Sequence, residues 1–420
     1  MKYYKRLIEQ RINSALKSTG VVVLAGPKFC GKTTTAKVFS KSFYSLDTKA
    51  KIELCKINPE AILIGENPRL IDEWQNVPDL WNVARSEIDK RDNKFGQFIF
   101  TGSSTPADKD EIYHSGAGRI VTIKMKPFSL LESHESDGSI SLSALFSHQE
   151  SVFNTNDNYS INDTAFYICR GGWPLSVLCD KENSLQVTKN YISTLFEFEN
   201  NPNKKFRNKK QTLFEMILKS YARNISTEAR RSLIIKDISA HEDRNIDEST
   251  FDAYVEALND LYIIKDIEAW NPNFRSKTAV ISTPTRHFVD TSVATAILNM
   301  SPNDLINDPE SLGLFFEDFA VKELSIYADY LNGEVRHYRD NNGLECDAVV
   351  HLENGDYALI EIKLGGKKLI EEGIRNLKNL KAKLENDNKH LPNFMAILTA
   401  TGPAFTQEGV HIIPINLLGI

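Results

Sequence analysis

Short apolar runs alternate with helical stretches over residues 1–130. The strand-like runs are VVVLA, SFYSL, RLID, QFIFTG and RIVTIKM. Strands that alternate with helices predict a parallel sheet covered on both faces, so we expect an α/β domain here. Residues 1–20 place apolar among polar positions at helical spacing, which predicts an amphipathic helix and not a signal peptide.

Beyond this domain the pattern changes. Ser, Asp, His and Asn become frequent over 131–158, which predicts a loop or insert before helices resume near Ala165. A basic cluster over 204–210 follows, and we interpret it as a linker or a contact surface. We therefore expect an insert and helical linker at 131–204 and a further domain at 205–300.

That further domain has the layout of a winged helix, with helices followed by a hairpin. LYIIKDIEAW and TAVIS are its expected strands, and NPNFR is the turn between them. The last helix spaces apolar residues at i, i+3, i+4 and i+7, so they belong to a core and not to a base-stacking surface: Phe251, Tyr254, Val255 and Leu258. Two interpretations stay open: a spacer between protein parts, or phosphate contacts through Arg244, Arg275 and Lys277.

Residues 301–420 return to a mixed pattern. A helix is expected from Phe315 to Tyr330 and another from Lys368 to Leu384. The strand-like runs are EVRHYRD, ECDAVVHL, YALIEIKL and FMAILTA. We expect a second, separate α/β domain.

Composition adds limits. A chain of 420 residues, 41% hydrophobic and 25% charged, indicates a packed protein of two or three domains. The net charge of -6 excludes a uniformly basic coat for nucleic acid, although not a local basic groove. The five cysteines form no CxxC pair, so we expect no disulfide framework, no zinc knuckle and a reducing cytoplasm. No apolar run approaches the ~18 residues that span a bilayer, so no membrane partner is expected.

One motif carries the first chemistry. The segment from Gly26 to Thr33 fits GxxxxGK[ST], between an apolar strand and a helix, which is the context of a P-loop. Its glycines let backbone N–H groups face phosphates, Lys32 contacts the β- and γ-phosphates, and Thr33 ligates magnesium. We expect ATP and Mg²⁺ to bind through these residues: Gly26, Pro27, Lys28, Phe29, Cys30, Gly31, Lys32, Thr33 and Thr34.

Two further strands end in polar residues. After RLI, Asp72 is expected to hold Mg²⁺ and Glu73 to polarise the attacking water. After QFIF, Thr101 and Ser103, with Ser104, are candidates to sense the γ-phosphate, with plain turn chemistry as the alternative. In SGAGRIVTI, Arg119 is a candidate arginine finger for a neighbouring subunit, which implies a homo-oligomer; a surface arginine is the alternative.

These segments together carry a resemblance. GPKFCGKTT, LIDEWQ, FIFTGSS and GAGRIVTIKMKPFSLLE resemble the AAA-type ATPase module of a prokaryotic family whose C-terminal half is a domain of unknown function. The likeness continues through a GG-x-P segment, Gly171 to Pro174, and into residues 230–290, so it spans nearly the whole chain. It implies an ATPase, and it supplies no substrate.

A second set of charged residues lies near the C-terminus. Glu317 falls on a predicted helix, Asp347 on a strand, and Glu361 and Lys363 on one face of the next strand. This order resembles the PD-(D/E)XK nuclease pattern, with Glu345-Cys346 where the pattern has its proline. Asp347 and Glu361, with Glu317, would hold Mg²⁺, and Lys363 would orient water or neutralise charge.

Three functional hypotheses follow. The first is an ATP-dependent switch or motor that controls a DNA-directed, nuclease-like C-terminal module. The second is a signalling or scaffold ATPase of the STAND kind, with a catalytically inactive C-terminal interaction domain. The third is transcription regulation through the winged helix.

Overall fold

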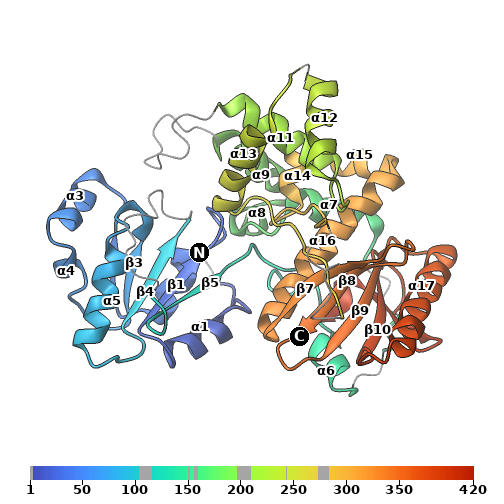
Figure 1. Ribbon diagram of the computed structural model, residues 1–420, viewed down its shortest axis with the longest axis horizontal. Helices are drawn as coiled ribbons and strands as arrows, with labels where there is room; N and C mark the ends of the chain where they lie inside the picture. Colours follow the sequence, from blue (N-terminus) through green and yellow to red (C-terminus); the bar gives the residue numbers. More distant parts are fainter. Residues whose placement is uncertain are drawn as a thin grey trace.

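The computed structural model describes residues 3–103, 116–149, 152–155, 159–195, 210–242, 244–272 and 283–420. Two α/β lobes lie side by side, and a helical region lies above the junction between them in the view of Figure 1. Part of the predicted hairpin, with Arg275 and Lys277, most of the basic cluster, and Ser104 lie outside the described residues.

The N-terminal lobe is built on a parallel sheet of five strands in the order β2-β3-β4-β1-β5. Its strands are those that the sequence predicts: β1 (Val21–Ala25), β2 (Ser42–Ser45), β3 (Arg69–Asp72), β4 (Phe98–Gly102) and β5 (Ile120–Lys124). β4 lies between β1 and β3, and all carboxyl ends point to one edge. The residues that follow β1, β3 and β4 therefore meet at that edge.

Both faces of this sheet are covered, which confirms the α/β prediction. Every residue of β1 is buried, and alternate residues enter two different cores: Val22 and Leu24 in one, Val21 and Val23 in the other. Buried strands of this kind are typical of parallel sheets between helices. The helices are α1 (Glu9–Leu16), α2 (Lys32–Phe39), α3 (Lys49–Ile57), α4 (Pro59–Ile62) and α5 (Leu80–Lys90).

The segment after β5 is mostly irregular in its described residues, as the sequence predicts, but it is not a free loop. It contains β6 (Ile140–Ser141) and α6 (Leu142–Phe146), and it packs on the C-terminal lobe. β6 pairs in parallel with β13 (Leu418–Gly419), and the Phe146 ring lies 5.1 Å from that of Phe394. The sequence missed this because the partners are far apart along the chain.

The middle region is helical. Its helices are α7 (Ile161–Arg170), α8 (Pro174–Leu178), α9 (Lys181–Leu195), α11 (Gln211–Arg223), α12 (Arg231–Glu242), α13 (Glu248–Asp260), α14 (Ser292–Ile297) and α15 (Pro302–Asn307). On α13, the side chains of Phe251, Tyr254 and Leu258 are buried, as the helical spacing predicts, and Val255 is partly buried.

The predicted first strand of the hairpin is not a strand in the described residues. Residues 264–269 make single bridges: Ile264 with Phe288 and Ile267 with Thr285, both antiparallel. Ala269 instead bridges to His337 in parallel, and the Trp270 N–H donates to the His337 carbonyl at 2.6 Å. This arm therefore borders the C-terminal sheet instead of standing free.

The C-terminal lobe is a mixed sheet of six strands in the order β11-β12-β10-β9-β8-β7. The strands are β7 (Gly333–Arg339), β8 (Glu345–Leu352), β9 (Tyr357–Lys363), β10 (Phe394–Thr399), β11 (Phe405–Gln407) and β12 (Val410–Pro414). Helices α16 (Pro309–Tyr330) and α17 (Lys367–Asn386) cover opposite faces, since Ala358 and Ile360 share a core with α16, and Leu359 shares one with α17. The predicted strands and helices are confirmed, with β11 and β12 in addition.

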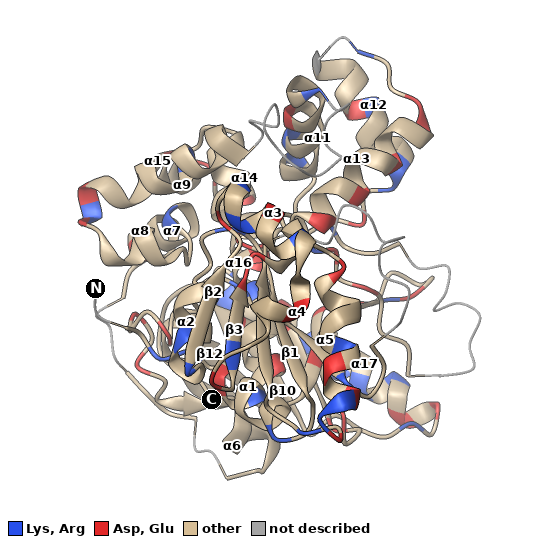
Figure 2. Cartoon of the chain, turned by 90° about the vertical axis from the view of Figure 1, so that its left-hand side faces the viewer, with Lys and Arg blue, Asp and Glu red and all other residues tan. Residues whose placement is uncertain are grey.

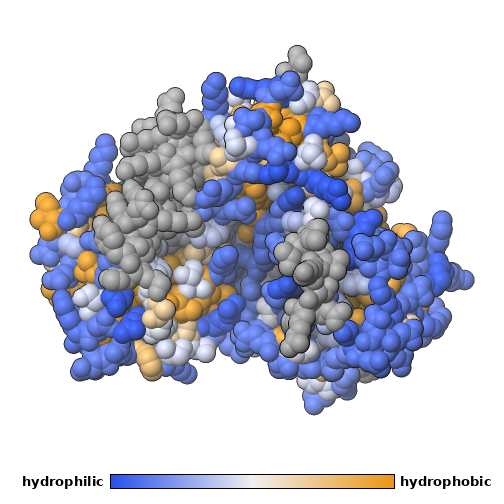
Figure 3. Space-filling view, viewed as in Figure 1, coloured by the Kyte–Doolittle hydropathy of each residue, from blue (hydrophilic) through white to orange (hydrophobic). Residues whose placement is uncertain are grey.

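The surface carries charges of both signs, interspersed over its helices (Figure 2). The face drawn in Figure 3 is largely hydrophilic, with apolar residues in scattered patches. All five cysteines are free thiols. Among the described residues, no helix is long and apolar enough to cross a membrane.

Candidate functional site

The loop after β1 is shaped by its glycines. Gly26 has a φ of 154°, and a Cβ there would lie 2.2 Å from the Met125 carbonyl oxygen. Gly31, with a φ of 99°, is the residue before α2. Only glycine adopts these conformations without strain, so the loop needs both residues.

Lys32 is buried inside this loop. Its Nζ donates to the carbonyl oxygens of Gly26 and Pro27, at 2.9 and 2.7 Å. Both acceptors are neutral carbonyls, so the ammonium charge has no carboxylate partner in these contacts. A phosphate group is the ligand that such a held charge at a helix N-terminus attracts. Thr34 is exposed on the first turn of α2.

Asp72, the last residue of β3, contacts both α2 and β4 at the carboxyl edge of the sheet. Thr33 Oγ1 donates to Asp72 Oδ1 at 2.7 Å, and Thr101 Oγ1 donates to the same oxygen. A hydroxyl and a carboxylate are hard oxygen ligands of the kind that Mg²⁺ prefers. Thr33 and Asp72, predicted as partners from the sequence, are therefore in direct contact.

Glu73 follows in a left-handed conformation, with a φ of 57°. Its Oε2 accepts hydrogen bonds from Ser103 Oγ at 3.1 Å and from Gln75 Nε2. The structure thus brings together Glu73 and Ser103, and adds Gln75. Sequence reasoning missed Gln75, although LIDEWQ places it two residues beyond the carboxylate.

Arg119 lies far from this edge. It precedes β5, whose first residue pairs with Val21 at the start of β1, so all five residues of β1 separate it from the loop. At about 3.3 Å per residue this is roughly 16 Å. Its Nε forms an ion pair with Asp89 at 2.9 Å. Within one chain, Arg119 does not belong to the nucleotide site.

Residues from outside the sheet contact the loop. Phe29, 60% exposed and with a φ of 63°, meets the Tyr191 ring of α9 edge-on at 5.9 Å. A Cβ at Gly31 would lie 3.5 Å from Cγ of Pro174, the proline of the GG-x-P segment. Arg6 donates to the Cys30 carbonyl at 2.9 Å. The helical region and the N-terminal segment therefore border the nucleotide loop.

Three of the four C-terminal residues are in contact, and Glu317 interacts with them through its charge. Lys363 Nζ lies 2.6 Å from Glu361 Oε2 and 3.0 Å from Asp347 Oδ2. Asp347 Oδ2 accepts a further hydrogen bond from the Ile362 N–H at 2.7 Å. Glu317 reaches the group from α16, close enough for its charge to interact with those of all three.

The charge balance of this cluster is set by burial. Burial and the Asp347 charge raise the pKa of Glu361 to about 8, although Lys363 opposes this. Burial and Asp347 likewise raise the pKa of Glu317 well above its usual value. In the described part of the chain, no group of three or more His, Cys, Asp or Glu residues has the geometry to hold a metal ion. Lys363 lies between the two carboxylates where a cation would otherwise balance them.

Comparison with known protein families identifies the kind of domain that forms the N-terminal lobe. Residues 18–134 match the family model described as an AAA domain. The N-terminal lobe is an AAA domain. Residues 161–304 and 312–418 match two domains of unknown function, DUF8612 and DUF4143.

Relatives of the whole chain are distant. Uncharacterized protein Rv2008c of Mycobacterium tuberculosis is 23% identical over 378 residues, covering 87% of this chain and 75% of that protein. Uncharacterized protein Mb2031c of Mycobacterium bovis matches with the same values.

Solved structures with partial likeness include the RuvB Holliday junction branch migration motor of Thermotoga maritima, at 13% identity and a TM-score of 0.26 over 61% of this chain and 88% of that one. The Aeropyrum pernix ORC1 protein in complex with DNA has 10% identity and a TM-score of 0.27, over 73% of this chain and 94% of that one. The STAND protein PH0952 of Pyrococcus horikoshii has 15% identity and a TM-score of 0.22, over 78% of this chain and 47% of that one. Scores this low carry no information on function.

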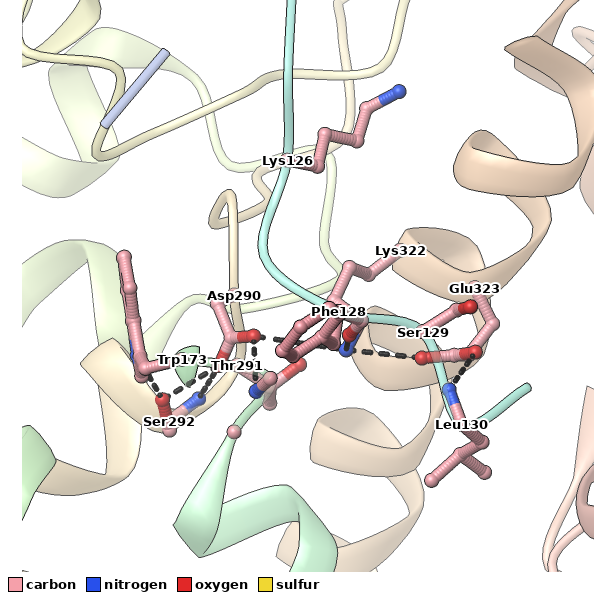
Figure 4. Close-up of polar contacts among 12 residues, drawn as sticks. Lys126, Phe128, Ser129, Leu130, Trp173, Asp290, Thr291, Ser292, Lys322 and Glu323 are labelled. Carbon is pink, nitrogen blue, oxygen red and sulfur yellow. Dashed lines mark hydrogen bonds and ion pairs between the residues drawn. The ribbon is translucent and has the colours of Figure 1, made fainter. Parts of the chain in front are cut away.

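A buried polar network joins the AAA domain to both other parts (Figure 4). Asp290 Oδ2 accepts the Gly172 N–H at 2.9 Å and lies 3.6 Å from Lys322 Nζ. Lys322 Nζ also donates to the Phe128 carbonyl at 3.1 Å, and Glu323 accepts the Leu130 N–H at 2.8 Å. The segment that leaves the AAA domain is thus held by charged groups of α16 and by the GG-x-P segment.

Proposed function

We propose that this protein binds and hydrolyses ATP with Mg²⁺, and that its nucleotide state controls a DNA-directed, nuclease-like C-terminal module. The observation that supports the first half is the direct contact of Thr33 and Thr101 with Asp72, beside Glu73 and its partner Ser103. These side chains supply the parts that phosphoryl transfer needs at one edge of a sheet.

Each residue has a role in this proposal. Lys32 neutralises the β- and γ-phosphates, and Thr33 with Asp72 would hold Mg²⁺. Glu73 takes a proton from, or orients, the attacking water, while Ser103 and Gln75 fix its carboxylate. Bound Mg²⁺ would stabilise the charge that develops on the transferred phosphoryl group.

The link to the C-terminal lobe runs through two hydrogen bonds of Arg6. Arg6 Nη1 binds the Cys30 carbonyl, and Arg6 Nη2 binds the Lys126 carbonyl at 2.7 Å. In this proposal, a shift of the loop on nucleotide binding is passed through Arg6 to the segment that follows β5. Further along that segment, Phe128 and Leu130 form hydrogen bonds with Lys322 and Glu323 on α16. The same helix carries Glu317.

The nuclease-like half rests on the cluster of Glu317, Asp347, Glu361 and Lys363. In this proposal Asp347 and Glu361, with Glu317, would hold Mg²⁺, and Lys363 would orient water or neutralise charge. The helices α11, α12 and α13 with the bridged arm serve as a winged helix. Arg119 acts on the nucleotide of a neighbouring copy in a homo-oligomer.

Two variants test the ATPase. Lys32→Ala removes the charge that meets the phosphates and should abolish hydrolysis, as measured by phosphate release. Glu73→Gln should keep nucleotide binding and stop turnover. Normal hydrolysis by Lys32→Ala would place the active site elsewhere.

Labelled plasmid tests the second half. Full-length protein is incubated with plasmid and Mg²⁺, with and without ATP, beside Asp347→Ala. Cleavage or retention that depends on ATP supports the proposal. Neither cleavage nor retention at low salt overturns the DNA-directed role.

A second function is favoured by the position of Lys363. Its ammonium pairs with both Asp347 and Glu361, and burial raises the pKa of Glu361 to about 8, so the ammonium balances the remaining Asp347 charge without a metal ion. A STAND-like scaffold ATPase, with an inactive C-terminal interaction domain, accounts for this. Light scattering would then show a size change with ATP that DNA and Asp347→Ala leave unaltered.

A further inference from the structure

A groove with basic walls surrounds α1 where the AAA domain faces the C-terminal lobe. Three hollows meet there, the larger two of about 470 and 830 Å³, and Tyr330 at the end of α16 lines all three. Arg11 on α1 pairs with Asp329 across the junction at 3.4 Å, which places the two lobes on either side. We call this the α1 groove.

The α1 groove carries a charge opposite to that of the chain. Its walls hold three acidic side chains, Glu9, Glu132 and Asp329, and Glu132 is paired with Arg6. Six basic side chains oppose them: Lys5, Arg6, Arg11, Lys17, Lys124 and Lys126. In a chain of net charge -6, this excess of cations is a local feature.

Lys265 adds a further cation from the arm after α13. Lys265 is an exposed residue, but protein lies around its side chain. Its ammonium interacts with the charges of Lys126, Lys124 and Asp329. Burial, and then the neighbouring Lys126 and Lys124 charges, lower the pKa of Lys265 to about 7. Like charges gathered around one carboxylate repel each other, and an anion in the groove relieves that repulsion.

We propose that the α1 groove binds phosphate groups, with the backbone of nucleic acid as the ligand that spans it and Tyr330 as a surface for a base. Cations from separate elements along a groove, with an aromatic ring at its centre, are the features that bind a nucleic-acid strand. This rests on the proposed function only for the DNA-directed role. The groove itself is independent of the nucleotide loop and of the Glu317 cluster.

The test measures binding of a fluorescein-labelled single-stranded oligonucleotide by anisotropy, across a salt series. Full-length protein is used with saturating ADP and Mg²⁺, so that the nucleotide loop is filled. The variant Lys17→Ala/Lys124→Ala/Lys265→Ala removes three exposed cations, two from the walls of the groove and Lys265 beside it. On a single strand each lost phosphate contact lowers the salt slope by about 0.7, so the slope should fall by roughly 2 and the affinity by at least about tenfold.

The matched control removes the same charge elsewhere. Lys51→Ala/Lys56→Ala/Lys367→Ala changes three exposed lysines on α3 and α17. This control should keep the salt slope. Equal effects of the two triple variants, or no binding by the wild type, would overturn the proposal. A thermal unfolding midpoint for each variant shows whether the fold is intact.

Two more measurements separate the possibilities. The first uses pyrophosphate as a competitor, to distinguish a site for free phosphates from a site for a strand. We expect pyrophosphate to displace the oligonucleotide from the wild type. If the protein bound pyrophosphate and not the oligonucleotide, the ligand would be a small anion.

The second varies the pH. Between pH 8 and 6.5 the wild type should gain affinity for the oligonucleotide more steeply than Lys265→Ala, because Lys265 takes up a proton in this range. If oligonucleotide binding requires the groove but does not change with ATP, this proposal stands, and the proposed control of the DNA-directed module by nucleotide state is wrong.

Discussion

Asp72 shows how one side chain organises a site. Its Oδ1 accepts hydrogen bonds from Thr33 on the first turn of α2 and from Thr101 on β4. The pairing of Thr33 with Asp72 follows from motif and strand order, so the sequence predicts it. The contacts of Arg6 and Tyr191 with the nucleotide loop do not follow from any motif, because tertiary packing alone brings these residues to it.

We predict that Asp72→Asn weakens binding of ATP in the presence of Mg²⁺. Asparagine keeps the shape but loses the charge, and hydrogen bonds to a charged group contribute about 1.5–3 kcal/mol each. A loss of roughly tenfold or more in affinity is expected, measured by titration with a fluorescent ATP analogue. The matched variant Thr101→Val removes only one donor and should bind almost normally. Equal affinity of Asp72→Asn and wild type with Mg²⁺ would remove Asp72 from the metal site.

At the scale of elements, the GG-x-P segment is a point of close approach. A Cβ at Gly172 would lie 2.1 Å from the Phe128 carbonyl oxygen, and the Phe128 N–H donates to the Gly172 carbonyl at 2.7 Å. The sequence singles out this segment only by resemblance. What it contacts depends on residues more than forty positions away, which no local pattern contains.

We predict that Gly172→Ala destabilises the protein by about 1–3 kcal/mol, the cost of forcing extra volume into a packed site. Urea unfolding measures the change. Gly313→Ala on α16 is the matched control, because a Cβ there meets nothing within 4 Å. Alanine in a helix interior is favoured over glycine, so Gly313→Ala should be neutral or stabilising. Equal stability of the two variants would contradict the close approach.

The strands and helices of both lobes could be predicted because their apolar spacing is regular. The hairpin prediction went wrong in its first arm for a physical reason. LYIIKDIEAW has the composition of a strand, but in the described residues its partners are split between the Thr285–Phe288 segment and the edge of β7. Composition predicts extended backbone and does not choose the partner.

At the scale of the molecule, Lys322 lies where all three parts meet. It is buried, 3.6 Å from Asp290 and 2.9 Å from Glu323. Burial alone lowers the pKa of a lysine, but here the Glu323 and Asp290 carboxylates outweigh burial and raise the pKa of Lys322. The ammonium therefore stays charged.

We predict that Lys322→Met destabilises the protein by about 3–5 kcal/mol, because two buried carboxylates lose their cation. Adding Glu323→Gln should recover part of this loss by neutralising one of them. Thermal unfolding at neutral pH measures both variants. The single variant Glu323→Gln is measured as well. If adding Glu323→Gln to Lys322→Met lowered the stability as much as Glu323→Gln alone does in the wild type, the two residues would not be coupled.

The pairing of β6 with β13 bears on the order in which the protein forms during synthesis. The AAA sheet is complete once β5 has emerged, but Ile140 of β6 must wait for its partner Leu418, which is made 278 positions later. At a ribosomal rate of 5–20 residues per second, that delay is roughly 15 to 55 seconds. During this time Leu142, Leu145 and Phe146, all buried in the finished protein, are without their cover. The nascent chain therefore exposes an apolar segment next to a folded domain, a place where a chaperone is expected to bind.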